Sequence, residues 1–178
     1  MQATRTVVFL SVESPLGDLL LTGEEAPDSR TGVVLTSVST TGQRTAPVVQ
    51  PCWRYAPGAL ADAAGQLAAY FDGARTAFDL DLAAPGGDLH RTAWRALDAL
   101  PHGTTATYPD LAARHGVPRE RVQPFGSAIL TNPLLIVRPC HRVLGPGGTA
   151  LGHPAGPTAK QWLLNHEAAH RPAPHRTP

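Results

Sequence analysis

Cys140 and His141 stand side by side after an apolar run at 134–137, and an acidic residue follows at Glu167. A cysteine attacks as the thiolate, so it needs a base or a positive charge that lowers its pKa. A histidine held by a carboxylate can be that base, because the carboxylate sets its tautomer. Adjacent side chains rarely point the same way, so we expect His141 to act through a bridging water. Residue types alone also allow an inert buried thiol, since free cysteine is among the most buried residue types.

Residues 86–170, which must position this site, are predicted to be mainly helical. Apolar residues at helical spacing predict a helix over 89–100, and 107–116 predicts a shorter one with a glycine stop. The next helix is expected to begin at Pro124, because proline suits a first turn, and to end near Thr131. Two short helices around a glycine-containing turn are typical of a helix-turn-helix, whose second helix enters a DNA groove.

Residues 1–85 are predicted to form a small sheet with one helix. Alternating and β-branched residues indicate strands, and a stretch rich in Thr, Pro and Gln indicates a loop. The predicted segments are strands at 7–12, 19–22, 33–38 and 78–82, a loop at 40–58 and a helix at 60–71. A linker is expected at 83–87, and a Pro- and His-rich stretch at 171–178 is expected to be a flexible tail.

Charge is divided unevenly along the chain. Residues 1–85 carry five arginines and nine acidic residues, a net charge of −4, whereas residues 86–178 carry ten basic and five acidic residues, a net charge of +5. This division suits a phosphate-facing unit attached to a scaffold. Cys52 and Cys140 are the only cysteines, which argues against a disulfide framework and a cysteine-based zinc site and favours the cytoplasm. No apolar stretch near the start is long enough for a signal core or a membrane span.

The run Pro-Cys-His-Arg-Val at 139–143 resembles the active-site motif of the O6-alkylguanine-DNA alkyltransferase family, the methylated-DNA--protein-cysteine methyltransferases. The resemblance covers nearly the whole chain and keeps its spacing to Asn132 and Glu167. Its other parts are the hairpin at 14–17, the helix at 67–73, the helix and turn at 94–104, the first DNA-binding helix at 107–112, the Asn-Pro pair at 132–133 and the closing helix at 160–167. The chain is therefore identified as a divergent member of this family.

The resemblance implies an α/β (α+β) fold with two domains. An antiparallel-sheet scaffold domain is expected at 1–85. The catalytic domain at 86–170 is expected to carry a winged helix-turn-helix-like unit that binds alkylated double-stranded DNA in the minor groove and flips the damaged base. The resemblance further implies a monomer without a cofactor, a metal or a membrane partner.

The resemblance also implies a reaction that each molecule performs once. Cys140 would attack the alkyl carbon, with His141 as the water-mediated base and Glu167 as the group that orients it. Tyr108 would help to neutralise the leaving guanine, and Asn132 would brace the turn around the site. The implied substrate and DNA contacts are Gln123, Arg121, Phe125, Gly126, Ser127, Arg142, His153 and Pro154.

Several of these contacts depart from the family pattern. Family members carry an arginine three residues before the position of Gly126, whereas this chain has Gln123 there, with Arg121 nearby on another helix face. Phe125 replaces a smaller aliphatic residue, either as a wedge into DNA or as a core residue. His153-Pro154 replaces a tyrosine and a small residue whose backbone N–H is expected to bind the O6 atom of the lesion. Proline has no N–H, so this donor is missing.

Three other functions are compatible with parts of the pattern. The run His-Glu-x-x-His at 166–170 matches a zinc-protease motif, although it needs a third ligand and only His175 follows it. A binding module that senses alkylated DNA without repairing it would keep the fold, but known relatives of that type lack the cysteine. A paralogue that takes an alkyl group from another lesion or from a small molecule suits the altered base pocket.

Overall fold

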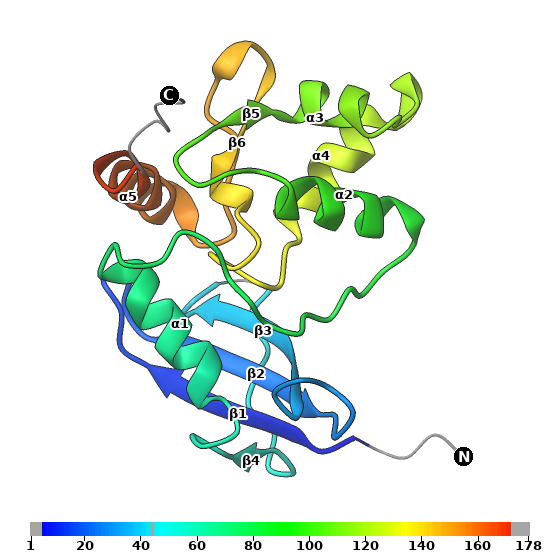
Figure 1. The fold of residues 1–178 in the computed structure, drawn as a ribbon. Helices are drawn as coiled ribbons and strands as arrows, with labels where there is room; N and C mark the ends of the chain where they lie inside the picture. Colours follow the sequence, from blue (N-terminus) through cyan, green and yellow to red (C-terminus); the bar gives the residue numbers. More distant parts are fainter. Residues whose placement is uncertain (1–4, 44, 172–178) are drawn as a thin grey trace, which may run out of the picture.

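The computed structural model describes residues 5–43 and 45–171, and most of the expected tail therefore lies outside the described residues. Three consecutive strands, β1 (Val7–Val12), β2 (Leu19–Glu25) and β3 (Val33–Thr40), pair in antiparallel fashion. Their alternating apolar residues point to one side, where α1 (Ala61–Phe71) covers the sheet (Figure 1). The expected strands and helix are thus confirmed, and β2 and β3 run further than predicted.

Two segments of the first half of the chain, up to residue 85, differ from the prediction. The expected loop at 40–58 contains β4 (Arg54–Tyr55), which pairs in parallel with β1 and makes the sheet order β3-β2-β1-β4. The expected strand at 78–82 is instead an extended segment with one bridge from Leu82 to β3. The Gln66 side chain takes both backbone groups of Asp79, because its Oε1 accepts from Asp79 N–H (2.8 Å) and its Nε2 donates to Asp79 O (3.0 Å).

The second half is mainly helical, as predicted. Its elements are α2 (Asp88–Asp98), β5 (Ala106–Thr107), α3 (Tyr108–Arg114), the 3₁₀ turn η1 (Arg119–Arg121) and α4 (Val122–Leu130). The Thr107 hydroxyl caps α3 by accepting from Asp110 N–H. The prediction that α4 starts at Pro124 is wrong, because the helix begins two residues earlier. Pro124 still lies in the first turn, where backbone N–H groups have no partner within the helix.

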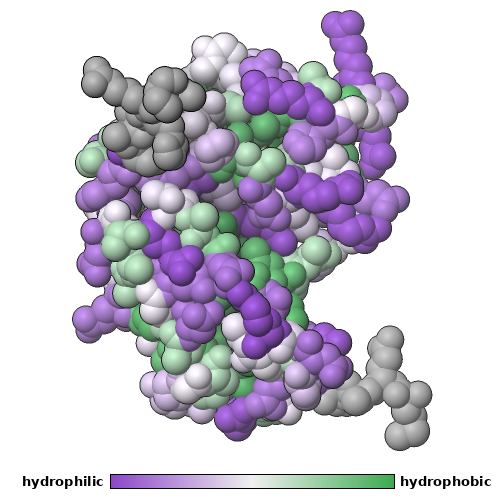
Figure 2. All heavy atoms as spheres, viewed as in Figure 1, coloured by the Kyte–Doolittle hydropathy of each residue, from purple (hydrophilic) through white to green (hydrophobic). Residues whose placement is uncertain are grey.

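The chain then returns to the first half. It passes through the 3₁₀ turn η2 (Cys140–Arg142), β6 (Val143–Leu144), the 3₁₀ turn η3 (Pro146–Gly148) and α5 (Gly156–Ala169). β6 pairs in parallel with β5, and α5 packs on α1, where the Trp162 and Phe71 ring centroids lie 5.8 Å apart. Hydrophobic residues show on one face mainly around the middle of the molecule, between the halves (Figure 2). Within the described ranges, no helix has the length and apolar character to cross a membrane.

Candidate active site

The chain reaches Cys140 through a buried turn that Asn132 holds together. Asn132 Nδ2 donates to the carbonyl oxygens of Leu134 (3.2 Å) and Arg138 (2.8 Å), and Oδ1 accepts from Leu134 N–H (3.1 Å). Ile136, between these residues, has a φ of 72°, in the left-handed region that β-branched residues avoid. Asn132 therefore binds both ends of a strained turn, in the place where the sequence predicted a brace.

The same turn is docked on the edge of β3. Val38 N–H donates to Pro133 O (2.9 Å), and Leu135 N–H donates to Val38 O (3.0 Å). Leu134, Leu135 and Ile136 are buried beside this bridge. The sheet of the first half therefore positions the segment that leads to Cys140.

Cys140 begins η2 and is only 2% exposed. Burial raises the pKa of its thiol to about 11, although the hydrogen bond from Asn132 Nδ2 to Sγ (3.3 Å) and the charge of Lys160 act in the opposite direction. The resting side chain is thus a neutral thiol at neutral pH. Attack on an electrophile requires a base that removes this proton.

His141 follows Cys140 and is fully buried, with Nε2 2.7 Å from Glu167 Oε1. Burial lowers the pKa of His141 and outweighs the opposing carboxylate, so the resting ring is neutral. A carboxylate only accepts, so Nε2 carries the ring proton and Nδ1 has the free lone pair. Nothing in the described part of the chain binds Nδ1. Nδ1 is therefore the basic atom of this site, and a water between it and Cys140 stays a prediction.

Glu167 is the centre of a buried hydrogen-bonded cluster. Arg142 donates to both of its oxygens, with Nε 2.9 Å from Oε2 and Nη2 2.8 Å from Oε1. Gly103 N–H donates to Oε2 (2.9 Å), and the Tyr70 hydroxyl donates to Oε1 (2.9 Å). Burial opposes ionisation, but the hydrogen bonds from His141 and Arg142 outweigh it and hold the pKa of Glu167 far below its usual range. The carboxylate is therefore charged at neutral pH and keeps the Nε2 proton in place.

Arg142 does not lie where the resemblance implied. Its side chain was expected to contact substrate or DNA, but the residue is 5% exposed, and Nη1 donates to Leu100 O. Its guanidinium is bound to the Glu167 carboxylate and so faces away from solvent. An arginine on a 3₁₀ turn gives no local signal of this burial, which depends on where α5 returns.

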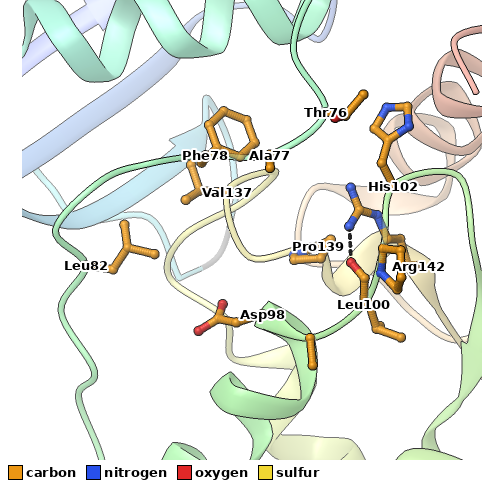
Figure 3. Close-up of a pocket in the computed structure, with 12 residues that line it drawn as sticks. Thr76, Ala77, Phe78, Leu82, Asp98, Leu100, His102, Val137, Pro139 and Arg142 are labelled. Carbon is orange, nitrogen blue, oxygen red and sulfur yellow. Dashed lines mark hydrogen bonds between the residues drawn. The ribbon is translucent and has the colours of Figure 1, made fainter. Parts of the chain in front are cut away.

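Arg142 borders a cavity of about 460 Å³ between the two halves (Figure 3). Phe78 and Leu82 line the cavity from the first half, and Asp98 and His102 line it from α2 and the turn after it. The interface between the halves is therefore incompletely packed beside the cluster.

Lys160 lies beside the site, although no sequence pattern predicted it there. The residue is 5% exposed, and its Nζ donates to Val143 O (2.6 Å) and to Leu151 O (3.0 Å). It thus ties together the two ends of the segment from β6 to the loop before α5, and its charge favours the Cys140 thiolate. The sequence holds no signal for this, because a lysine on a helix is usually exposed.

The predicted DNA contacts around α4 divide into exposed and buried residues. Gln123 and Ser127 are exposed on α4, and Arg121 is exposed at the end of η1. Phe125 is fully buried, so the core interpretation is right and the wedge interpretation is wrong.

Tyr108 and Gly126 meet where α3 packs on α4. Tyr108 is 5% exposed, and a Cβ atom at Gly126 would lie 3.1 Å from its Cδ2 atom. Only glycine lets the Tyr108 ring approach α4 this closely.

His153 and Pro154 lie in the loop before α5. They line a cavity of about 300 Å³ with Thr45, Leu130 and Gly152. His153 Nδ1 accepts from Ala155 N–H (3.3 Å), so the ring proton sits on Nε2. Burial, together with His141 at a ring-centroid distance of 6.5 Å, lowers the pKa of His153 to about 3. The Nε2–H group is buried and has no partner among the described residues, so the loop holds a neutral hydrogen-bond donor close to His141.

The His-Glu-x-x-His pattern is used for other contacts. His166 Nε2–H donates to Tyr70 O (2.8 Å), and His170 Nδ1–H donates to His166 O (2.8 Å). Glu167 binds His141, Arg142, Gly103 N–H and Tyr70, as described above. In residues 5–43 and 45–171, no three His, Cys, Asp or Glu side chains converge as metal ligands would. The geometry that the metalloprotease hypothesis requires is not formed in this part of the chain.

Known proteins resemble this chain along almost its whole length. The family profile described as "6-O-methylguanine DNA methyltransferase, DNA binding domain" matches residues 88–169. A methylated-DNA--protein-cysteine methyltransferase of Mycolicibacterium paratuberculosis is 38% identical over 167 residues, 94% of this chain and 96% of the relative. The chain belongs to the methylated-DNA--protein-cysteine methyltransferase family.

Other members of the family agree with this assignment. The crystal structure of Mycobacterium tuberculosis OGT in complex with DNA superposes with a TM-score of 0.80 at 34% identity, covering 93% of this chain and 96% of that chain. The methylated-DNA--protein-cysteine methyltransferase of Methanosarcina barkeri is 35% identical over 88% of this chain and 94% of its own length. The α/β fold and the family expected from the sequence are therefore confirmed.

Proposed function

We propose that the protein reverses alkylation damage in DNA by moving the alkyl group of an O6-alkylguanine irreversibly onto Cys140. One observation in this family member carries the proposal. His141, the residue after Cys140, is a buried neutral histidine whose Nε2 lies 2.7 Å from Oε1 of the charged Glu167 carboxylate. This arrangement leaves Nδ1 free to take the thiol proton, which the raised pKa of Cys140 makes necessary.

The reaction is a single displacement. The proton of Cys140 passes through a bridging water to His141 Nδ1, and Sγ forms a bond to the alkyl carbon while the bond from that carbon to O6 breaks. The electron pair stays on the guanine, which gains a proton, with the Tyr108 hydroxyl as the donor that neutralises it. Glu167 holds the imidazolium that forms. A thioether is a poor leaving group, so each molecule reacts once and needs no cofactor.

DNA binding is assigned to the surface around α4. Gln123 and Ser127 are exposed on this helix and Arg121 just before it, on the half of the chain with a net charge of +5. A helix-turn-helix face of this kind would enter the minor groove, where its basic residues contact phosphates. The flipped base would then enter beside His153.

Recognition of the base is where this chain departs from its relatives. Pro154 offers no backbone N–H, whereas the neighbouring His153 Nε2–H is buried and unpartnered within the described structure. A neutral donor at this place would bind an oxygen or nitrogen acceptor on the base edge. This supports O6-alkylguanine as the donor of the alkyl group even without the usual backbone contact.

We also infer two domains, at 1–85 and 86–170, and a cytoplasmic monomer. The extended segment between Leu82 and α2 coincides with the change of charge and supports this division. A reducing compartment keeps Cys140 available as a thiol.

The decisive experiment is intact-protein mass after incubation with duplex DNA that contains O6-methylguanine. The proposal expects wild type to gain one methyl group. Cys140→Ala should gain none, and Cys52→Ala is the matched control that should react like wild type, because Cys52 is exposed and precedes β4, at the sheet edge opposite to β3, on which the Cys140 segment docks. Free O6-benzylguanine serves as a second donor. Benzyl transfer without methyl transfer from DNA would favour the paralogue with another donor, and no transfer from either would refute the proposal.

A further inference from the structure

Tyr70 reaches from α1, in the first half of the chain, into the cluster around Glu167. Its hydroxyl donates to Glu167 Oε1 at 2.9 Å, and the two residues are 97 positions apart in the sequence. Tyr70 is 0% and Glu167 1% exposed, so water does not compete for this hydrogen bond. It joins the first half directly to the carboxylate that holds His141.

The Tyr70 ring is fixed by aromatic neighbours from both halves. Its centroid lies 5.5 Å from that of Phe78 and 5.6 Å from that of Phe71, while the rings of His166 and His102 lie at 5.3 and 6.1 Å. Such contacts restrict the ring to one orientation. The hydroxyl is therefore held at one point against the carboxylate.

The Tyr70 hydroxyl donates to the same carboxylate oxygen that binds His141. Oε1 is the atom that also lies 2.7 Å from His141 Nε2. Burial and the nearby negative charge of Glu167 raise the pKa of Tyr70, so its phenol stays protonated and can only donate to this carboxylate. Arg142 Nη2 also donates to Oε1 (2.8 Å), so Tyr70 and Arg142 are the two donors that share this oxygen with His141 and hold the carboxylate in one orientation toward its ring.

Packing alone does not secure this contact. The cavity of about 460 Å³ that Phe78 and Arg142 border lies beside it, so apolar side chains do not fill the interface between the halves there (Figure 3). Aromatic packing around Tyr70 and polar bonds, among them the Tyr70 hydroxyl on Glu167 and the His166 bond to Tyr70 O, therefore hold α1 against α5 together.

We propose that Tyr70 is a positioning residue of the alkyl-transfer reaction, through which the first half of the chain holds Glu167 and thereby His141 in the geometry that activates Cys140. The first half is then a working part of the active site as well as a scaffold. This inference rests on the proposed function, since alkyl transfer is the reaction that Tyr70 serves.

The test is Tyr70→Phe, which removes the hydroxyl and keeps the ring. Tyr55→Phe is the matched control, because Tyr55 is in the same half, 60% exposed and far along the sheet on β4. The rate of alkyl transfer at saturating alkylated DNA should fall about threefold to thirtyfold in Tyr70→Phe, which corresponds to part of the free energy of one hydrogen bond to a charged group, because the bond acts on the rate only through Glu167. The DNA concentration for half-maximal rate should stay within twofold, and Tyr55→Phe should match wild type in both.

A double-mutant comparison separates positioning from loss of folding. If Tyr70 acts through Glu167, adding Tyr70→Phe to Glu167→Gln should cause little further loss of rate. A rate within twofold of wild type for Tyr70→Phe would overturn the proposal. A full further loss in the Glu167→Gln background, or a parallel change in half-saturating DNA, would overturn it as well.

A second probe keeps this test independent of the proposed function. Iodoacetamide alkylates thiolates, so the proposal expects it to label the activated Cys140 as well as the exposed Cys52, and peptide mass distinguishes the two. Tyr70→Phe should slow labelling of Cys140 at least threefold and leave labelling of Cys52 unchanged. If wild type accepts no alkyl group from DNA or O6-benzylguanine, the proposed function fails, whereas equal Cys140 labelling in wild type and Tyr70→Phe refutes the role of Tyr70.

Discussion

Replacing Arg142 with methionine tests whether this arginine serves the DNA or the interior. A DNA contact would lose affinity and salt dependence on substitution. The structure instead has Arg142 buried, with its guanidinium bound to both oxygens of Glu167 and to Leu100 O. Arg142→Met keeps a similar volume but leaves the carboxylate without its cation. We therefore expect the variant to lose stability and alkyl-transfer rate, with DNA affinity unchanged.

The magnitude follows from the burial of the pair. Glu167 is 1% exposed, and removing one partner of a buried ion pair costs about 3–5 kcal/mol, because the other charge stays buried. For a chain of this length, each kcal/mol lowers Tm by about 2–4 °C, so we expect a loss of about 6–20 °C. Gly103 and Tyr70 still donate to the carboxylate, which favours the lower part of this range.

Urea and thermal unfolding measure the loss of stability in Arg142→Met. Binding to an alkylated duplex at several salt concentrations measures whether Arg142 contacts DNA. Arg121→Met is the matched control, since Arg121 is exposed before α4. This control should keep stability within about 0.5 kcal/mol and bind DNA more weakly, with a shallower salt dependence. Arg142 would instead serve the DNA if Arg142→Met is as stable as wild type and binds DNA more weakly with a shallower salt dependence.

Three further results are expected. Because the folded pKa of Glu167 is depressed, its contribution to stability is complete above the unfolded value of about 4.3 and is lost as pH falls below it, so acid unfolding of Glu167→Gln should lack this component. Asn132→Ala removes the donors to Arg138 O and Cys140 Sγ, so unfolding free energy should drop by about 2–4 kcal/mol, and Cys140 labelling should need higher pH. Gln123→Arg supplies the arginine usual in the family, so binding of alkylated duplex should tighten about threefold to tenfold at low salt, a gain that titration at high salt should reduce.

Local patterns predicted most of the elements because each pattern reflects only neighbouring residues. The strands β1 to β3 and the helices α1 to α3 follow from apolar spacing and from glycine or proline at their ends. The segment at 78–82 pairs with β3 only at Leu82, because a distant side chain, Gln66, takes both backbone groups of Asp79 that a longer strand would pair. The start of α4 was missed because proline is allowed anywhere in a first turn, so Pro124 limits the start without setting it.

In the site too, local residue order could be predicted, whereas contacts between distant residues could not. The order of Cys140, His141 and Glu167 could be taken from the sequence, since nucleophile, base and carboxylate have fixed chemical requirements. The buried partners Arg142, Lys160 and Tyr70 could not be, because charged or aromatic residue types leave open which side faces the interior.

The sequence by itself determined the fold class, the family, the candidate nucleophile and the uneven charge, because these depend on residue types and short spacings. Only the tertiary structure decided which atoms meet: Nε2 of His141 rather than Nδ1 on Glu167, Arg142 on the carboxylate rather than on DNA, and Tyr70 in the active-site cluster. Those pairings arise where α1 and α5 pack together. Their energies depend on burial, which exists only after residues nearly one hundred positions apart come into contact.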